Sequence, residues 1–471
     1  DDRVFIEKYI EQPRHIEIQI LCDKHGNQLH LGERECSIQR RYQKVIEECP
    51  SPLVDEAMRE SMASQALRLA REVNYDSAGT VEFVVDSKKN FYFLEMNTRL
   101  QVEHPVTELV TGIDLVEQMI YCADNKKLKL KQSDIKLDGW SIESRIYAED
   151  PSKDFLPSIG RISEYIEPNS SRFEGGKVRN DTGISPGSEI SIYYDPMISK
   201  LAVHHKDRSS AIDLMINSLQ SYYLSGVENN IGFLISILND TKFKKGYLST
   251  NFIKEKFNKG YQSEIGITEE IIKKISIASV LVFIKQLKNI DLLKNSELTV
   301  KIHDQYVPIK IKKLSLTDKI YSVLVKIHNS NFSLCSDWRL NHKLLAAKIN
   351  DKKEYFKINK ILNLNKINIE HLGIKIDVSI FSSTQKIYYD YMPKQSNEDL
   401  SRMLISPMPG LVKAVSVVDN QKIKSGEQLI IIEAMKMENI LRSEKDCIID
   451  KVLVKEGDSV STDQELILFK K

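Results

Sequence analysis

The chain has 471 residues, which is too long for one domain and suggests roughly two to four. Charged residues make up 28% of it and the formal net charge is +1, so neither nucleic acid nor a membrane surface is expected as a partner. No apolar run is long enough to span a bilayer, and the six cysteines form no C-x-x-C pair, so zinc-knuckle and thioredoxin-like sites are not indicated.

Residues 1–127 alternate strand-like and helix-like patterns. Strict alternation over 15–21 predicts a strand with isoleucines on one face and polar side chains on the other. Apolar positions at helical spacing predict a helix over 55–73, and the runs 80–85 and 91–97 around a polar turn predict a hairpin. The sequence starts within a strand-like pattern, without an initiator methionine or signal peptide, so we interpret it as a chain cut inside a domain.

Three further regions follow. Residues 128–260 again mix strand-like and helix-like patterns, interrupted by prolines and glycines that indicate turns. The region 261–395 begins with a predicted amphipathic helix over 267–290, capped by Thr268, and continues as short β-rich runs. A helix of this kind is more often a core element than a docking surface. The polar stretch that follows predicts a linker at 396–404.

Two glutamates lie inside apolar runs of the predicted hairpin, Glu82 in TVEFVV and Glu95 in FYFLEMN. Carboxylates in such strands are rarely structural unless they are paired or bound to a metal. Together with the amide oxygen of Asn97 they offer the oxygen ligands that Mg²⁺ prefers beside nucleotide phosphates. If the chain stays extended, every second side chain from 95 to 103 shares one face, which adds a guanidinium, an amide and a carboxylate. A solvated edge strand of mixed charge is the weaker alternative.

The stretch EMNTRLQVEHPVTE resembles the C-terminal part of an ATP-grasp domain, specifically that of biotin carboxylase. The resemblance implies that Glu82, Glu95 and Asn97 bind Mg²⁺ or Mn²⁺ with ATP. It implies that Glu103 is the general base that deprotonates bicarbonate. It also implies that Arg145 binds biotin and stabilises its enolate, where negative charge develops.

The same resemblance implies two further sets of contacts. Bicarbonate would be held by Lys44, Arg99, Gln101 and the backbone of Val102. ATP would be contacted by Glu7, Lys8, Ile10, His15, Gln39, Glu82 and Glu95. The resemblance implies four catalytic residues: Lys44, Arg99, Glu103 and Arg145. Tyr42 departs from the histidine or asparagine more usual in its place, which changes a nucleotide contact.

Residues 405–471 contain an internal repeat. With an offset of 37, Leu411 aligns with Ile448, and the apolar positions that follow align in the same way. Two similar β-rich halves predict a small two-fold β-sandwich. The segment EAMKMEN at 433–439 joins the halves and puts Lys436 at the connecting turn.

Lys436 lies between two methionines at this turn. Most lysines are solvated surface charges, but paired methionines on an exposed turn have no packing purpose of their own. The segment, preceded by SPMPG, resembles the biotinyl domain of biotin-dependent carboxylases, whereas lipoyl domains of the same fold carry Asp and Ala beside the lysine. The resemblance implies biotin on Lys436, attached by a biotin protein ligase.

Over nearly its whole length the chain resembles alpha subunits of propionyl-CoA carboxylase, in the biotin-dependent acyl-CoA carboxylase family. This implies a multidomain α+β protein. Its parts would be a partial ATP-grasp biotin carboxylase domain (1–127), the carboxylase C-terminal subdomain (128–260), a helix-plus-β-barrel domain that joins the beta subunit (261–395), and an all-β biotinyl domain of barrel-sandwich hybrid type (405–471).

The implied activity is that of an ATP-dependent ligase, which carboxylates biotin from ATP and bicarbonate and passes the carboxyl group to a carboxyltransferase beta subunit for propionyl-CoA. Two alternatives remain: an alpha subunit for acetyl-CoA or 3-methylcrotonyl-CoA, or a carrier and assembly module without catalysis. The family's Gly-rich phosphate lid has no counterpart in the sequence, so we expect no activity from this piece alone. A bacterial cytoplasm is the expected location, or the mitochondrial matrix if the source is eukaryotic.

Overall fold

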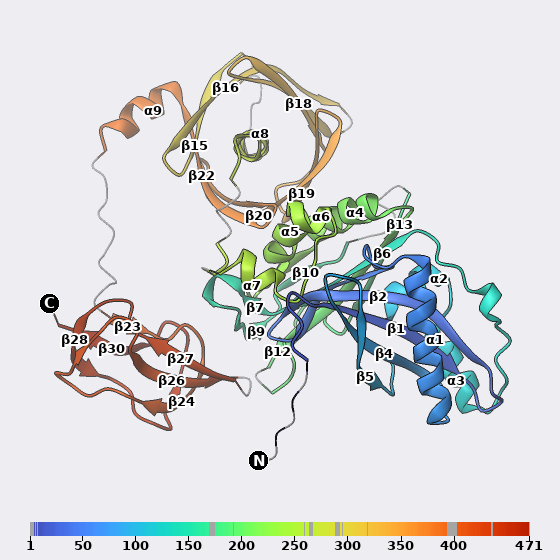
Figure 1. Cartoon of the computed structure of the whole chain (residues 1–471). Helices are drawn as coiled ribbons and strands as arrows, with labels where there is room; N and C mark the ends of the chain where they lie inside the picture. The colour runs from blue at the N-terminus through green and yellow to red at the C-terminus, as the bar shows by residue number, and fades with distance from the viewer. Residues whose placement is uncertain are drawn as a thin grey trace.

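A computed structural model gives the fold of the chain (Figure 1). It describes residues 4, 6, 8–168, 175–191, 193–258, 260–262, 267–287, 293, 295–317, 319–392, 403–434 and 437–470. Within these residues, no helix combines the length and the apolar character needed to cross a membrane.

An antiparallel sheet of eight strands, in the order β11-β13-β6-β3-β2-β1-β4-β5, forms the base of the first half. The strands are β1 (Arg14–Cys22), β2 (Gln28–Arg40), β3 (Gln43–Cys49), β4 (Ser77–Val85), β5 (Phe91–Asn97), β6 (Trp140–Tyr147), β11 (Lys177–Thr182) and β13 (Met197–His205). β3 pairs with β6, with Ile46 opposite Ser144. One sheet therefore contains strands from both 1–127 and 128–260, the two regions that the sequence patterns separated.

The alternation of β1 decides which face of the sheet is packed and which is polar. Ile16, Ile18 and Ile20 are fully buried and pack against α1 (Glu56–Glu72). The N-cap of α1 is Asp55, whose side chain accepts a hydrogen bond from the backbone N–H of Met58. The predicted strand and helix are both confirmed, and the polar side chains of β1 point to the opposite face of the sheet.

The predicted hairpin is confirmed as β4 and β5, which pair antiparallel. The extended course beyond it is wrong, because β5 ends at Asn97. The chain turns at residues 102–103, and α2 (His104–Thr111) begins with Glu103 at its N-cap and Pro105 in its first turn. Proline favours a helix start, since its missing N–H would have no partner there.

Helices and short strands complete this half of the molecule. They are α3 (Leu115–Ala123), the 3₁₀ turns η1 (Gln132–Asp134) and η2 (Pro151–Lys153), β7 (Glu149–Asp150), β8 (Leu156–Pro157), β9 (Gly160–Arg161), β10 (Glu164–Ile166), β12 (Glu189–Ile190), α4 (Arg208–Ser221), β14 (Tyr223–Ser225), α5 (Ile231–Asn239), α6 (Thr241–Lys244) and α7 (Phe252–Lys256). α4 and α5 bury their apolar side chains in one core with the sheet strands β3, β6 and β13.

A closed eight-stranded barrel follows, with α8 inside it (Figure 1). Its strands are β15 (Glu297–Ile302), β16 (Gln305–Thr317), β17 (Ile320–Ile327), β18 (Ser330–Ser336), β19 (Leu344–Ile349), β20 (Lys352–Asn363), β21 (Lys366–His371) and β22 (Ile374–Ser382). α8 (Glu269–Gln286) is capped by Thr268 as predicted, but it is not amphipathic, because the run Ile275–Ile284 is buried on every side. α9 (Ser383–Asp390) replaces the last predicted β-run.

The last region is a sandwich of two four-stranded sheets, β23-β30-β28-β25 and β27-β26-β24-β29. Its strands are β23 (Met403–Ile405), β24 (Gly410–Val415), β25 (Lys422–Ile423), β26 (Gln428–Ala434), β27 (Met437–Arg442), β28 (Cys447–Val452), β29 (Ser459–Val460) and β30 (Glu465–Phe469). The offset of 37 carries β24 onto β28 and β25 onto β29, residue for residue. The predicted two-fold repeat is confirmed.

Candidate functional site

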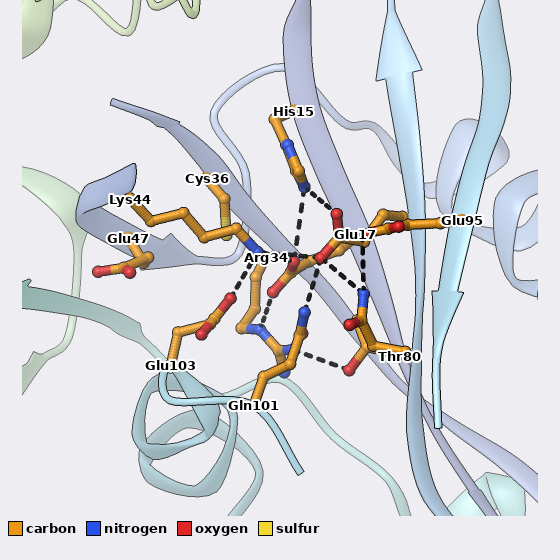
Figure 2. Close-up of polar contacts among 12 residues, drawn as sticks. His15, Glu17, Arg34, Cys36, Lys44, Glu47, Thr80, Glu95, Gln101 and Glu103 are labelled. Carbon is orange, nitrogen blue, oxygen red and sulfur yellow. Dashed lines mark hydrogen bonds and ion pairs between the residues drawn. The ribbon is translucent and has the colours of Figure 1, made fainter. Parts of the chain in front are cut away.

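A pocket of about 430 Å³ opens over the polar face of the eight-stranded sheet. It is lined by His15, Gln39, Tyr42, Gln43, Lys44, Glu82, Leu94, Glu95, Asn97, Arg99, Gln101, Val102, Glu103 and Arg145. Strands β1 to β6 and the turn before α2 all contribute, so residues far apart in sequence converge on one site (Figure 2).

Lys44 lies at the centre of this pocket and contacts three carboxylates (Figure 2). Its Nζ lies 2.7 Å from Glu17 Oε2, 3.1 Å from Glu82 Oε1 and 2.6 Å from Glu103 Oε1. Burial by itself lowers the pKa of Lys44, but the surrounding carboxylates outweigh it and hold the pKa far above its usual value. Lys44 therefore stays charged and fixes Glu103 in place.

Arg34 supports the site from below and is fully buried. Its Nε lies 2.5 Å from Glu17 Oε1, and its Nη2 donates to Gln101 Oε1 at 2.8 Å. The remaining N–H groups reach three further side-chain oxygens, those of Gln19, Thr80 and Thr107. Such a planar fork orients Gln101 toward the pocket, where its Nε2 donates to Glu82 at 2.6 Å.

His15 links two of the carboxylates at the pocket edge (Figure 2). Its Nε2 lies 3.0 Å from Glu82 Oε2 and 3.7 Å from Glu17 Oε2. Burial alone would lower the pKa of His15, but these two carboxylates raise it to about 9. Burial alone would raise the pKa of the Glu17 carboxyl, but the positive charges of Lys44 and Arg34 outweigh it and hold this pKa well below its usual range.

The proposed metal ligands meet at the open side of the pocket. Glu82 and Glu95 are opposite each other across β4 and β5. Asn97 Nδ2 lies 3.2 Å from Glu82 Oε1 and 3.3 Å from Glu95 Oε1. Glu95 is exposed, so its carboxylate oxygens can still take a ligand from solution. Two carboxylates and one amide oxygen are the kind of ligand set that a hard divalent cation such as Mg²⁺ or Mn²⁺ prefers, and Asn97 would offer its oxygen once its amide turns over.

Arg145 connects the pocket to the sheet behind it. Its Nη2 donates to Glu103 Oε2 at 3.0 Å, and its Nε donates to Glu47 Oε1 at 2.6 Å. Arg145 is 8% exposed, so the guanidinium is held between one carboxylate at the pocket and one behind it. Gln39 is also held, since its Nε2 lies 3.1 Å from His15 Nδ1.

Several predicted residues lie away from this cluster. Lys8 is exposed and bonds to Tyr92 of β5 at 2.7 Å, and neither it nor Ile10 lines the pocket. Arg99 lines the pocket, but its Nη1 donates to the Leu100 carbonyl rather than to a carboxylate. Tyr42 stands at the mouth, 97% exposed.

Two predicted residues, Glu7 and Lys436, lie outside the described residues. The strands on either side of Lys436 are described, and Ala434 of β26 is paired with Met437 of β27. The pairing joins the last strand of the first half to the first strand of the second, and the predicted turn itself lies outside the described residues.

Four ionisable residues in or behind the site were not predicted from the sequence: Glu17, Arg34, Glu47 and Glu143. The alternation of β1 did place Glu17 on a polar face, and that was the available signal. Arg34, Glu47 and Glu143 gave none, because only the strand pairing shows that they are buried beneath the pocket.

Four family models match successive parts of the chain. They describe a carbamoyl-phosphate synthase L chain ATP-binding domain at residues 1–131 and a biotin carboxylase C-terminal domain at 143–255. A propionyl-coenzyme A carboxylase BT domain matches 283–395, and a biotin-requiring enzyme model matches 403–469.

Known proteins resemble the chain over nearly all of its length. The propionyl-CoA carboxylase alpha chain of Ruegeria pomeroyi is 42% identical over 100% of this chain and 72% of its own length. The mitochondrial alpha chain of Homo sapiens is 44% identical over 99% of this chain and 65% of its own. This chain thus spans about two thirds of the curated relatives.

A solved structure resembles the first half. It is the biotin carboxylase domain of 2-oxoglutarate carboxylase from Hydrogenobacter thermophilus, in complex with MgADP, ADP and bicarbonate. It is 48% identical, covers 53% of this chain and 54% of its own, and has a TM-score of 0.51. The chain combines a biotin carboxylase part, a BT barrel and a biotinyl sandwich, and it belongs to the family of propionyl-CoA carboxylase alpha chains.

Proposed function

We propose that this chain supplies the bicarbonate and metal groups of an ATP-dependent biotin carboxylase and carries the biotin on Lys436. The contact of Glu103 with both Lys44 and Arg145 is the observation that carries the proposal. It joins a carboxylate that can accept a proton to an arginine that can stabilise an anion, in one pocket beside a candidate Mg²⁺ site.

Glu103 would remove the proton of bicarbonate. Its two oxygens are held by Lys44 at 2.6 Å and by Arg145 at 3.0 Å, so the carboxyl group is fixed in position before substrate arrives. Arg99, Gln101 and the backbone of Val102 line the same pocket and would orient the bicarbonate there.

The nucleotide would lie along the other side of the pocket, with His15 and Gln39 as contacts, and with Glu7, Lys8 and Ile10 on the segment before β1. Mg²⁺ or Mn²⁺, when bound to Glu82, Glu95 and Asn97, would neutralise charge on the phosphates of ATP. Arg145 would then hold the negative oxygen of the biotin ring while the carboxyl group is added.

The carrier half would deliver the carboxylated biotin to a second site. A tethered cofactor gains effective concentration at both sites that its linker can reach. We infer that the second site is on a carboxyltransferase beta subunit that joins at the barrel and uses propionyl-CoA. Acetyl-CoA and 3-methylcrotonyl-CoA are the alternative acceptors, and a carrier module without catalysis is the alternative from another class.

For the division of the chain we propose 1–127 and 128–260 for the carboxylase, 261–395 for the barrel domain, 396–404 for the linker and 405–471 for the carrier. The relatives include a bacterial protein and a mitochondrial one. We propose a bacterial cytoplasm for this chain, or the mitochondrial matrix if its source is eukaryotic.

The proposed chemistry is tested in a chimaera in which this chain replaces the matching segment of the Ruegeria pomeroyi relative. We expect bicarbonate-dependent ATP cleavage, and we expect Glu103→Gln to reduce it by roughly 10²-fold or more while ATP binding persists. Glu117→Gln, which changes an exposed glutamate of α3, is the control and should stay active. Normal turnover by Glu103→Gln would refute the general-base assignment, and an inactive chimaera that binds ATP would favour the carrier module.

A further inference from the structure

Glu143 is a buried carboxyl group that the proposed mechanism leaves unused. It lies on β6, two residues before Arg145 and on the same face of the strand, and its side chain is fully buried. Among the described residues neither of its carboxyl oxygens has a hydrogen-bond partner. An ionised carboxylate is strongly destabilised in such a place, so the group is neutral and carries a proton.

Glu47 faces Glu143 from the neighbouring strand. The two residues are direct partners in the register of β3 and β6, so their Cβ atoms are about 5 Å apart on one face of the sheet. Glu47 is also fully buried. Its Oε1 accepts from Arg145 Nε at 2.6 Å, whereas its Oε2 has no partner among the described residues.

The two carboxyl groups therefore complement each other. Glu143 has a proton to donate and Glu47 has a buried oxygen with nothing to accept. Burial raises the pKa of both carboxyls, that of Glu47 to about 7, and neighbouring negative charge adds to the effect on each. Two adjacent buried carboxyls cannot both ionise, and one proton between them satisfies both.

We propose that Glu47 and Glu143 share one proton and act as a positioning pair, which holds Arg145 in place for the carboxylation of biotin. This rests on the proposed function, because Arg145 is assigned there to the biotin oxygen. With one shared proton the pair carries a single negative charge, which balances the positive charge of the Arg145 guanidinium. The pair then occupies only one edge of the guanidinium and leaves the other free to donate hydrogen bonds.

Other charged or titratable groups near the pair bond elsewhere. Lys200 of β13 donates to the Val102 carbonyl at 3.0 Å and lies 3.4 Å from Asp181. Lys44 bonds to Glu17, Glu82 and Glu103. On α2, His104 Nδ1 lies 2.9 Å from the Gln101 carbonyl. In the described part of the chain, Arg145 is the cation bonded to Glu47.

The arrangement gives Arg145 one permanent partner and one that changes. Glu103 Oε2 accepts from Arg145 Nη2 at 3.0 Å. When Glu103 takes the proton of bicarbonate it loses its charge, and its claim on Arg145 weakens. Glu47 Oε1 lies 2.6 Å from both Nε and Nη2 of Arg145, so it holds that edge of the guanidinium in place. The N–H of Nη2 that Glu103 gives up can then donate to the oxygen of the biotin ring.

Infrared difference spectroscopy on this chain tests the shared proton directly. At neutral pH, the wild type minus Glu143→Gln should show the carbonyl stretch of a protonated carboxyl group. The control is Glu48→Gln, because Glu48, next to Glu47 on β3, is ion-paired with Arg208 at 2.7 Å and should contribute no such band. Only carboxylate bands in the Glu143→Gln difference would overturn the proposal.

The positioning role is tested by the split between two rates in the chimaera. Glu47→Gln should lower biotin carboxylation by roughly 10²-fold, as expected of a displaced catalytic group, but lower ATP cleavage without biotin much less. Glu143→Gln, which can still donate to Glu47, should stay within a few-fold of wild type.

Equal losses of both rates in Glu47→Gln would overturn the positioning role, as would a loss in Glu143→Gln as large as that in Glu47→Gln. A wild-type chimaera without ATP cleavage would instead refute the proposed function. The infrared result would still decide whether the proton is shared, so the two failures can be told apart.

Discussion

Removing Arg34 should destabilise the carboxylase half more than any loss of a surface charge. Arg34 is fully buried and paired with Glu17 at 2.5 Å. Removal of one partner of a buried ion pair costs about 3–5 kcal/mol, because the other charge stays buried. In Arg34→Met, four further oxygens lose a donor. Because these side chains can partly reorient, this loss adds only about 1–2 kcal/mol to the destabilisation.

The expected loss is thus about 4–7 kcal/mol in the free energy of unfolding. With a slope of about 2 kcal/mol per molar urea, the midpoint falls by roughly 2–3.5 M. The chain has two tryptophans, Trp140 on β6 and Trp338 in the barrel core. In a Trp338→Phe background, fluorescence therefore reports on the sheet that contains Arg34.

Two comparisons make this result specific. Arg161→Met removes an exposed arginine from β9 and should change stability by about 0.5 kcal/mol or less. The double variant Glu17→Gln/Arg34→Met should lose less than the sum of its single variants, by about 1–3 kcal/mol, because the two residues are coupled. An Arg34→Met variant within about 1 kcal/mol of wild type would show that the buried pair with Glu17 does not stabilise the sheet.

Three other outcomes follow from the same structure. The folded-state pKa of His15 is about 9, above the ordinary 6.5. The stabilisation that protonated His15 gives to the folded state is therefore complete below pH 6.5 and is lost as pH rises through 9. Urea titrations of the metal-free protein should show stability falling by up to about 3 kcal/mol across that window, and His15→Gln should flatten the fall. Asn97→Leu should weaken Mn²⁺ binding by roughly tenfold or more in electron paramagnetic resonance titrations, and an unchanged affinity would exclude Asn97 as a ligand. Gly373→Ala should loosen the contact between α5 and the barrel, since its Cβ would lie 2.3 Å from the Gly232 Cα at a φ of +77°. Faster proteolysis between the two would be the readout, and an unchanged digestion pattern would contradict it.

Local patterns along the sequence predicted the elements that depend on local physics. The isoleucine alternation at Ile16, Ile18 and Ile20 predicted a strand because successive side chains point to opposite faces. The repeat in the last region predicted two equivalent sheets because the strands recur at a constant offset. Both depend on neighbours in the sequence.

The long-range pairings were beyond such patterns. The partnership of Glu47 with Glu143 joins residues almost a hundred positions apart, and no local period indicates it. α8 looked amphipathic because its ends are polar, yet the barrel closes around its middle. The turn at 102–103 was also missed, although the proline that follows it favours a helix start.

For the candidate site, sequence found the residues that face the pocket and missed those behind it. The sequence brings several polar residues together in one short stretch or its hairpin partner, and this clustering could be recognised. They are Glu82, Asn97, Gln101 and Glu103. Arg34 and Glu47 act through the residues they hold, and an isolated arginine or glutamate in a strand does not reveal such contacts.

Peptide mass spectrometry decides whether Lys436 carries biotin, on which the carrier role depends. The chain is coexpressed with a biotin protein ligase and free biotin, beside Lys436→Arg as the matched control and a known carrier that shows the ligase to be active. We expect one biotin adduct, on the peptide that holds Lys436, and none in the control variant. An unmodified Lys436 beside a modified known carrier would contradict the account and leave an ATP-grasp protein with a different acceptor.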